Sequence, residues 1–236
     1  MVIVCFGPGP VFKGGIANYN TSLAKAFDKR GDCEVHIVSW TQQYPAIIPR
    51  EFKDLASKKD QLEGSNIKVH YLTNYNNPFT WTNTAAEIIK LKPDVVIFQW
   101  AIAIQGLPLG FIAKKLNKAG VKTVFDLHFV IQKEHSSIDK RFTKFALKNG
   151  KNFITHALKT YNELKEVFPQ TNFQLFDKKD VIDVSKLRSD GQLPVINLYH
   201  PVYDMFKPVP NYDIEAFKTV HGLKKHVFLF FGFIRK

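Results

Sequence analysis

The 236-residue chain carries 33 Lys and Arg against 21 Asp and Glu, for a net charge of +12, and 45% of its residues are hydrophobic. A chain of this length and apolar content can bury a core, which argues against disorder. Two cysteines are too few for a disulfide framework and indicate a reducing, cytoplasmic compartment. No run of about 18 apolar residues occurs, so we expect any membrane contact to be peripheral.

Short apolar runs alternate with segments of helical periodicity along most of the chain. The expected strands are Val2–Phe6, Glu34–Trp40, Ile67–Leu72, Asp94–Trp100, Val121–Leu127, Asn152–Thr155 and Pro194–Leu198. The expected helices between them are Ile16–Arg30, Thr82–Lys92, Leu109–Lys118, Ile138–Asn149 and Ala157–Phe168. This alternation is typical of βαβ units. Residues 1–208 are therefore predicted to form one doubly wound parallel sheet, a Rossmann-like α/β domain.

The sequence changes character after Phe206. A linker, KPVPNY, leads to a short expected helix at Asp213–Leu223 and a very apolar expected strand at His226–Ile234. A strand of this composition is normally covered on both faces by further elements. We therefore expect residues 209–236 to be a linker helix and the first strand of a truncated second domain.

Two glycine motifs near the amino terminus do not match nucleotide-binding fingerprints. After Gly7 and Gly9, Phe12 replaces the third glycine of a dinucleotide motif, and no acidic residue ends the second strand. Gly14 and Gly15 precede a helix, where backbone N–H groups and the helix dipole favour an anion. An ordinary strand-to-helix turn that uses glycine for its backbone freedom explains the same pair.

His128 ends the fifth expected strand, and ligands of open α/β sheets bind at the carboxyl ends of strands. Its ring there either donates to a sugar hydroxyl or is a satisfied core histidine. Glu134 follows in the next loop and is expected to share the cleft. The sequence has no H-E-x-x-H element, no paired cysteines and no histidines at metal-ligand spacing, so neither a metal nor a cofactor is expected.

The order and spacing of five segments resemble the amino-terminal half of the family-4 retaining glycosyltransferases of GT-B fold. They are Gly14-Gly15-Ile16-Ala17, Lys92-Pro93-Asp94-Val95-Val96, Asp126-Leu127-His128, the stretch from Asn197 to Phe206, and Phe230 to Lys236. The resemblance implies that the first domain holds a glycan or lipid-linked acceptor. It also implies that a second domain holds a nucleotide-sugar, which is a substrate, and that no metal is required.

The resemblance also implies roles for individual residues. Gly14 and Gly15 would meet the acceptor or the donor phosphates, His128 would be the catalytic group at the anomeric centre, and Arg235 would contact the donor diphosphate. The family's Glu-x7-Glu segment is absent, so this chain alone is expected to be inactive. The alternative is a non-catalytic binding module for an acidic glycan or lipid-linked sugar.

The excess of basic residues leaves two partner classes to consider. The lysines are spread along the chain as on ordinary solvated helices, so no nucleic-acid partner is expected. The segment from Lys140 to Lys151 interleaves cations with aromatic side chains, and it is either a surface for anionic lipid or a helix docked on the sheet. The protein is thus expected to be cytoplasmic, with contact to the cytoplasmic membrane face as one hypothesis.

Overall fold

The computed structural model describes residues 1–47, 53–54, 61–131, 136–177, 191–201 and 209–228. The chain divides into two compact units, Met1–Pro201 and Val202–Lys236. The assignment of residues 209–236 to the start of a donor-binding domain stays a prediction.

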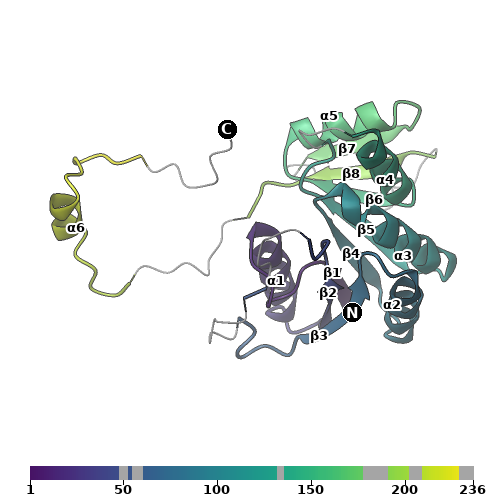
Figure 1. The fold of residues 1–236 in the computed structure, drawn as a ribbon, viewed down its shortest axis with the longest axis horizontal. Coiled ribbons are helices and arrows are strands. Elements are labelled where there is room, and N and C mark those ends of the chain that lie inside the picture. The colour runs from purple at the N-terminus through teal and green to yellow at the C-terminus, as the bar shows by residue number, and fades with distance from the viewer. Residues whose placement is uncertain (48–52, 55–60, 132–135, 178–190, 202–208, 229–236) are drawn as a thin grey trace. The chain divides into compact units, whose positions relative to one another are not determined.

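One eight-stranded sheet forms the first unit, with strand order β3-β2-β1-β4-β5-β6-β8-β7 (Figure 1). Every neighbouring pair of strands is parallel. The strands are β1 (Val2–Phe6), β2 (Glu34–Gln42), β3 (Lys68–Asn74), β4 (Val95–Trp100), β5 (Lys122–Leu127), β6 (Asn152–Thr155), β7 (Phe173–Asp177) and β8 (Leu193–Asn197). The predicted Rossmann-like α/β class is confirmed.

Helices cover both faces of the sheet, as a doubly wound fold requires (Figure 1). They are α1 (Gly15–Asp28), α2 (Pro78–Lys90), the short 3-10 helix η1 (Ala103–Gln105), α3 (Gly106–Lys118), α4 (Ser137–Leu147) and α5 (Leu158–Val167). Helix α1 packs on the face formed by Ile3, Cys5 and Ile37. Helices α2 to α5 pack on the opposite face, which holds the larger aromatic core around Phe6, Phe98 and Phe125.

The core explains why the central strands are apolar on both faces. In β1, Val4 and Phe6 face the core under α2 to α5, while Ile3 and Cys5 face α1, and all four are at most 1% exposed. Parallel strands buried in this way read as continuous apolar runs rather than as alternating ones. This double burial made β1, β4 and β5 recognisable in the sequence.

Helices α3 and α4 cross at close range because two glycines of α3 face α4. A Cβ at position 106 would lie 2.5 Å from the carbonyl oxygen of Phe142, and one at position 110 would lie 2.8 Å from Phe145 Cδ1. Such separations are shorter than real Cβ contacts, so side chains at either position would force the helices apart.

The sequence missed one strand. Strand β7 pairs only with β8, at the edge of the sheet, and its five residues are half-buried or exposed. Strand β2 continues to Gln42, two residues beyond its predicted end. Phe12, between β1 and α1, forms an isolated antiparallel bridge with Lys53, between β2 and β3.

The second unit contains α6 (Ile214–Val220), whose amino terminus is capped by the Asp213 carboxylate accepting from Ala216 N–H. Of the expected strand at His226–Ile234, residues 226–228 are not in a strand, and the rest lies outside the described residues. In the described part of the chain, no helix is long and apolar enough to cross a membrane.

Candidate functional site

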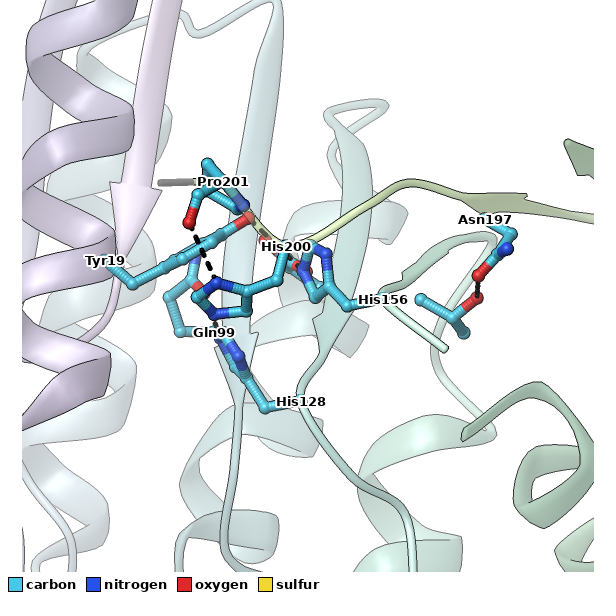
Figure 2. Close-up of polar contacts among 9 residues, drawn as sticks. Tyr19, Gln99, His128, His156, Asn197, His200 and Pro201 are labelled. Atoms are coloured by element: carbon cyan, nitrogen blue, oxygen red, sulfur yellow. Dashed lines mark hydrogen bonds and ion pairs between the residues drawn. The ribbon is translucent and has the colours of Figure 1, made fainter. Parts of the chain in front are cut away.

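The candidate site lies at the carboxyl ends of the central strands. From β1 the chain runs to β2 and β3 on one side, and it then returns through β4 to build the other side of the sheet. This reversal makes a topological switch point between β1 and β4, where open α/β sheets bind ligands. Four aromatic rings gather beside it, from α1 and from the segments that follow β5, β6 and β8: Tyr19, His128, His156 and His200 (Figure 2).

His128 is held by a neighbouring strand and by the first helix. Its backbone N–H donates to the carbonyl of Trp100, and its Nε2 lies 2.8 Å from Gln99 Oε1 (Figure 2). The Tyr19 ring meets the imidazole edge to face, with 4.8 Å between centroids. Burial lowers the pKa of His128 to about 4, and the opposing effect of the Asp126 charge is smaller. His128 is therefore a neutral, fixed ring at pH 7.

His156 forms a buried hydrogen-bonded pair with Asp126. Its Nε2 lies 2.8 Å from Asp126 Oδ1, and the side chains are 8% and 1% exposed. Burial lowers the pKa of His156, but the hydrogen bond to Asp126 and the negative charge of that carboxylate outweigh the burial and leave the pKa raised. Tyr19 Oη lies 3.3 Å from the same nitrogen. The pair thus places the imidazole of His156 next to the ring of His128, with 5.5 Å between the two centroids.

His200 completes the ring cluster from the segment after β8. Its ring centroid lies 5.3 Å from those of Tyr19 and His156 and 6.3 Å from that of His128 (Figure 2). The residue is exposed, unlike the other members of the cluster. His200 therefore forms the outer side of the cluster.

Several buried polar atoms near the cluster lack a hydrogen-bond partner among the described residues. They are Asn20 Oδ1, Gln99 Nε2, Asp126 Oδ2 and His156 Nδ1. Because buried polar groups in native proteins are normally paired, this concentration marks a place where a water molecule or a ligand hydroxyl completes the bonding.

The structure places the predicted glycines at the start of α1. Gly14 caps the helix with φ 114°, a left-handed conformation that favours glycine, and no heavy atom lies within 4 Å of its Cβ direction. Tyr19, whose ring touches His128, lies in the same helix, about one turn after Gly15. Gly14 and His128 are thus linked through α1, but binding at either residue stays a prediction.

Two further predicted site residues, Glu134 and Arg235, lie outside the described residues. Conversely, the sequence missed Tyr19, Gln99, Asp126 and His156 as members of the site. A signal existed for three of them: each is a polar residue at or directly after the carboxyl end of an apolar strand, as Gln99 is in VVIFQW. Among the described residues, no group of three or more His, Cys, Asp or Glu side chains is arranged to hold a metal ion.

Comparisons with known proteins agree with this architecture. The chain is similar to the crystal structure of HepE from Anabaena in complex with UDP, with 14% identity and a TM-score of 0.51 over 94% of this chain and 50% of that one. It is also similar to UDP-GlcNAc 2-epimerase from Methanocaldococcus jannaschii, with 11% identity and a TM-score of 0.43 over 71% of this chain and 42% of that one. At 14% identity the likeness to HepE concerns the fold alone.

The chain spans about half the length of HepE. A comparison with curated proteins finds no match. The model of Glycosyltransferase Family 4, however, matches residues 13–173, which is more than half of the chain and includes α1, His128 and His156. The chain belongs to glycosyltransferase family 4.

Proposed function

We propose that the protein serves the transfer of a sugar from a nucleotide-sugar donor to a glycan or lipid-linked acceptor, with retention of configuration at the anomeric carbon. The observation that carries the proposal is the neutral, fixed imidazole of His128 at the switch point of a family-4 domain. A UDP complex is known for HepE, whose fold is similar, which supports a nucleotide-sugar as the donor.

In this transfer, the bond between the anomeric carbon and the donor phosphate oxygen breaks, and a new bond to the acceptor oxygen forms. The proton of the acceptor hydroxyl leaves with the departing diphosphate. Positive charge develops at the anomeric carbon in the transition state, and a preorganised dipole stabilises such charge best when its position is fixed. The lone pair of neutral His128 supplies that dipole, whereas a protonated ring would oppose the charge.

The proposal assigns acceptor binding to the first unit, and contacts with the donor diphosphate to residues of the same chain. Gly14 and Gly15, at the amino terminus of a 14-residue helix, would meet phosphate oxygens of either substrate. Arg235 and Glu134 keep the roles predicted for them, with the donor diphosphate and the acceptor. No two glutamates in the sequence are spaced as in Glu-x7-Glu. We therefore propose that this chain binds an acceptor but transfers no sugar by itself.

Binding of short acidic and neutral glycans and of UDP-hexoses to the purified chain tests the proposal, with His128→Phe compared with the wild type. We expect glycan binding that weakens at least tenfold in the variant, and no transfer of sugar. The matched control His221→Phe alters a histidine of the second unit and should bind as the wild type does. Lack of binding to every glycan and every UDP-hexose, or equal binding by His128→Phe, would overturn the proposal.

A non-catalytic module for an acidic glycan is the alternative, and the same titration separates it. A transferase domain should couple the two ligands, so a UDP-hexose should change the affinity for the glycan. A binding module should show glycan affinity that does not depend on the nucleotide-sugar.

We also propose peripheral contact with an anionic membrane surface through α4. Lys140, Arg141, Lys144 and Lys148 are exposed on this helix, and its one acid, Asp139, is held in a capping box with Ser136. The aromatic residues of α4 are half-buried, and those facing Gly106 and Gly110 pack on α3. Binding to lipid would thus be electrostatic and would not involve insertion of aromatic side chains. Each cation near the surface would contribute about 1 kcal/mol to the binding free energy.

Co-sedimentation with vesicles of phosphatidylcholine, with and without phosphatidylglycerol, tests this contact. We expect binding to the anionic vesicles only, lost at high salt and in a variant in which the four cations of α4 are replaced by glutamine. Equal pelleting with both vesicle types at low salt would exclude the electrostatic account.

A further inference from the structure

We infer that Gln99 is a positioning residue that fixes the proton of His128 on Nε2, and that Gly7 is glycine because the Gln99 side chain needs the space. The inference rests on two sets of contacts, those between Gln99 and His128 and those between Gly7 and Gln99. Its catalytic consequence rests on the proposed function, but its structural content does not.

The hydrogen bond between the two side chains determines where the proton lies. His128 Nε2 is 2.8 Å from Gln99 Oε1, and an amide oxygen only accepts hydrogen bonds (Figure 2). Nε2 must therefore carry a proton. A neutral imidazole has one N–H, so Nδ1 keeps its lone pair and is the acceptor that His128 presents to a ligand.

Gln99 itself is tightly confined. It is 2% exposed and lies on β4 next to Asp126 of β5, its partner in the strand register. Among the described residues, the Gln99 amide nitrogen has no hydrogen-bond partner, so the contact with His128 orients the amide. A residue that cannot accept a hydrogen bond at position 99 would leave the His128 ring free to exchange its proton between the two nitrogens.

Gly7 provides the space that this arrangement needs. A Cβ at position 7 would lie 2.7 Å from Gln99 Cγ, 3.0 Å from Gln99 Cβ and 3.1 Å from Asn20 Nδ2. The backbone of Gly7 is not in the left-handed region, so its conformation alone does not call for glycine. The neighbouring chain is fixed as well, because Gly7 N–H donates to Val38 and Asn20 Nδ2 donates to Pro8. A methyl group at position 7 must therefore displace Gln99.

This contact gives a role to the first glycine of the Gly7-Pro8-Gly9 motif, which is no dinucleotide fingerprint. The chain of contacts runs from the end of β1 through Gln99 to the ring of His128. In the proposed transfer, Gln99 would act only through His128, by presenting the Nδ1 lone pair to the sugar.

Long-range proton–nitrogen NMR of the full chain, labelled with ¹⁵N at histidine, measures the protonated nitrogen directly. Loss of the His128 signals in His128→Phe assigns them. We expect the wild type to show the Nε2–H form between pH 6 and 8. Gln99→Leu should lose this single form and show exchange between both forms, and Gly7→Ala should shift in the same direction.

Two further variants keep the test decisive if Gln99→Leu or Gly7→Ala folds poorly. Gln99→Glu retains an acceptor and should keep the Nε2–H form while its charge raises the pKa of His128. Gln105→Leu removes another buried glutamine, 3% exposed, and should leave the His128 signals unchanged. Protonation of His128 on Nδ1 in the wild type would overturn the inference. An Nε2–H form that persists unchanged in Gln99→Leu would also overturn it.

These outcomes are independent of sugar transfer. If the Nε2–H form is found and depends on Gln99, but no glycan or nucleotide-sugar binds, the proposed function fails and the positioning role stands. If ligands bind but the form does not depend on Gln99, the positioning role fails alone.

Discussion

His156 Nε2 lies 2.8 Å from Asp126 Oδ1, in a pair that joins the ends of β5 and β6 and is almost fully buried. A buried pair of this kind is costly to break because removing one partner leaves a buried polar group without its hydrogen bond. The pair also raises the pKa of His156, whose ring lies beside that of His128.

Replacing Asp126 with asparagine should lower the pKa of His156. The substitution removes the negative charge and weakens the hydrogen bond, so the lowering effect of burial is no longer outweighed. Histidine NMR titration measures the change. In the control Asp94→Asn, the altered carboxylate accepts from Val2 N–H at the amino end of the sheet, and the pKa of His156 should not move. An unchanged pKa in Asp126→Asn would contradict the account of the pair.

The low pKa of His128 predicts that stability falls in acid. An unfolded histidine titrates near 6.5, whereas His128 in the fold has a pKa of about 4. Between these values the unfolded chain binds a proton that folded His128 does not bind. The free energy of unfolding is therefore unaffected by this group above pH 6.5 and decreases as the pH falls below 6.5. The decrease amounts to about 2 kcal/mol at pH 5. His156 has a raised pKa and acts with the opposite sign, so the effect must be measured as a difference.

Urea unfolding of the wild type and of His128→Phe at pH 7 and pH 5 provides that difference. The stability of the wild type relative to the variant should be lower at pH 5 than at pH 7. A difference that is the same at both pH values would show that His128 titrates normally.

The two cysteines should react very differently with iodoacetamide at pH 8. Burial, and to a lesser degree the charge of Asp126, raises the pKa of Cys5 to about 12, and Cys5 is fully buried. Cys33 is half-exposed, although its hydrogen bond to Asp32 raises its pKa as well. Because the thiolate is the reactive form, mass spectrometry should find slow modification at Cys33 and none at Cys5 until the protein is unfolded. Modification of Cys5 in the native protein would contradict its burial under α1.

Alanine at either glycine of the α3–α4 contact should destabilise the protein. Position 106 is the more severe case, because the new methyl group would meet the Phe142 backbone, which cannot rotate away. Overpacking of this kind costs about 1–3 kcal/mol, which exceeds the gain in helix propensity from glycine to alanine. Thermal unfolding should show a lower midpoint for Gly106→Ala than for Lys114→Ala, a control at an exposed position of α3. Equal midpoints would show that the helices can separate without cost.

Most of the fold was predictable because β1, β4 and β5 are buried on both faces and therefore have continuous apolar sequences. The strand β7 escaped because its side chains, Phe173 to Asp177, are at best half-buried at the sheet edge. Such a strand depends on its pairing with β8 and not on its own composition. The ends of helices shifted for a similar reason: α2 begins at Pro78 because Asn77 caps it, earlier than its apolar periodicity indicates.

The site was predictable only where the sequence position of a single residue was enough to indicate ligand binding. His128 follows a strand with an acidic residue, so its position alone indicated a ligand edge. Gln99 and His156 act through partners that are 29 and 30 residues away in the sequence, and such pairings become visible only when the strand order is known. In the sequence, Gly7 suggests only a nucleotide motif, whereas the constraint on this position is the volume of the Gln99 side chain on β4.

The central claim is that ligands of a sugar transferase bind at the ring cluster of Tyr19, His128, His156 and His200. NMR of the histidine-labelled chain, titrated with glycans and UDP-hexoses, tests it most directly. The account predicts that the imidazole signals of His128, His156 and His200 shift on binding. The signals of His36 and His70 should not shift, because these residues lie on β2 and β3 and their rings contact each other. Saturable binding that leaves the three site histidines unchanged, or that shifts His36 and His70 instead, would contradict it.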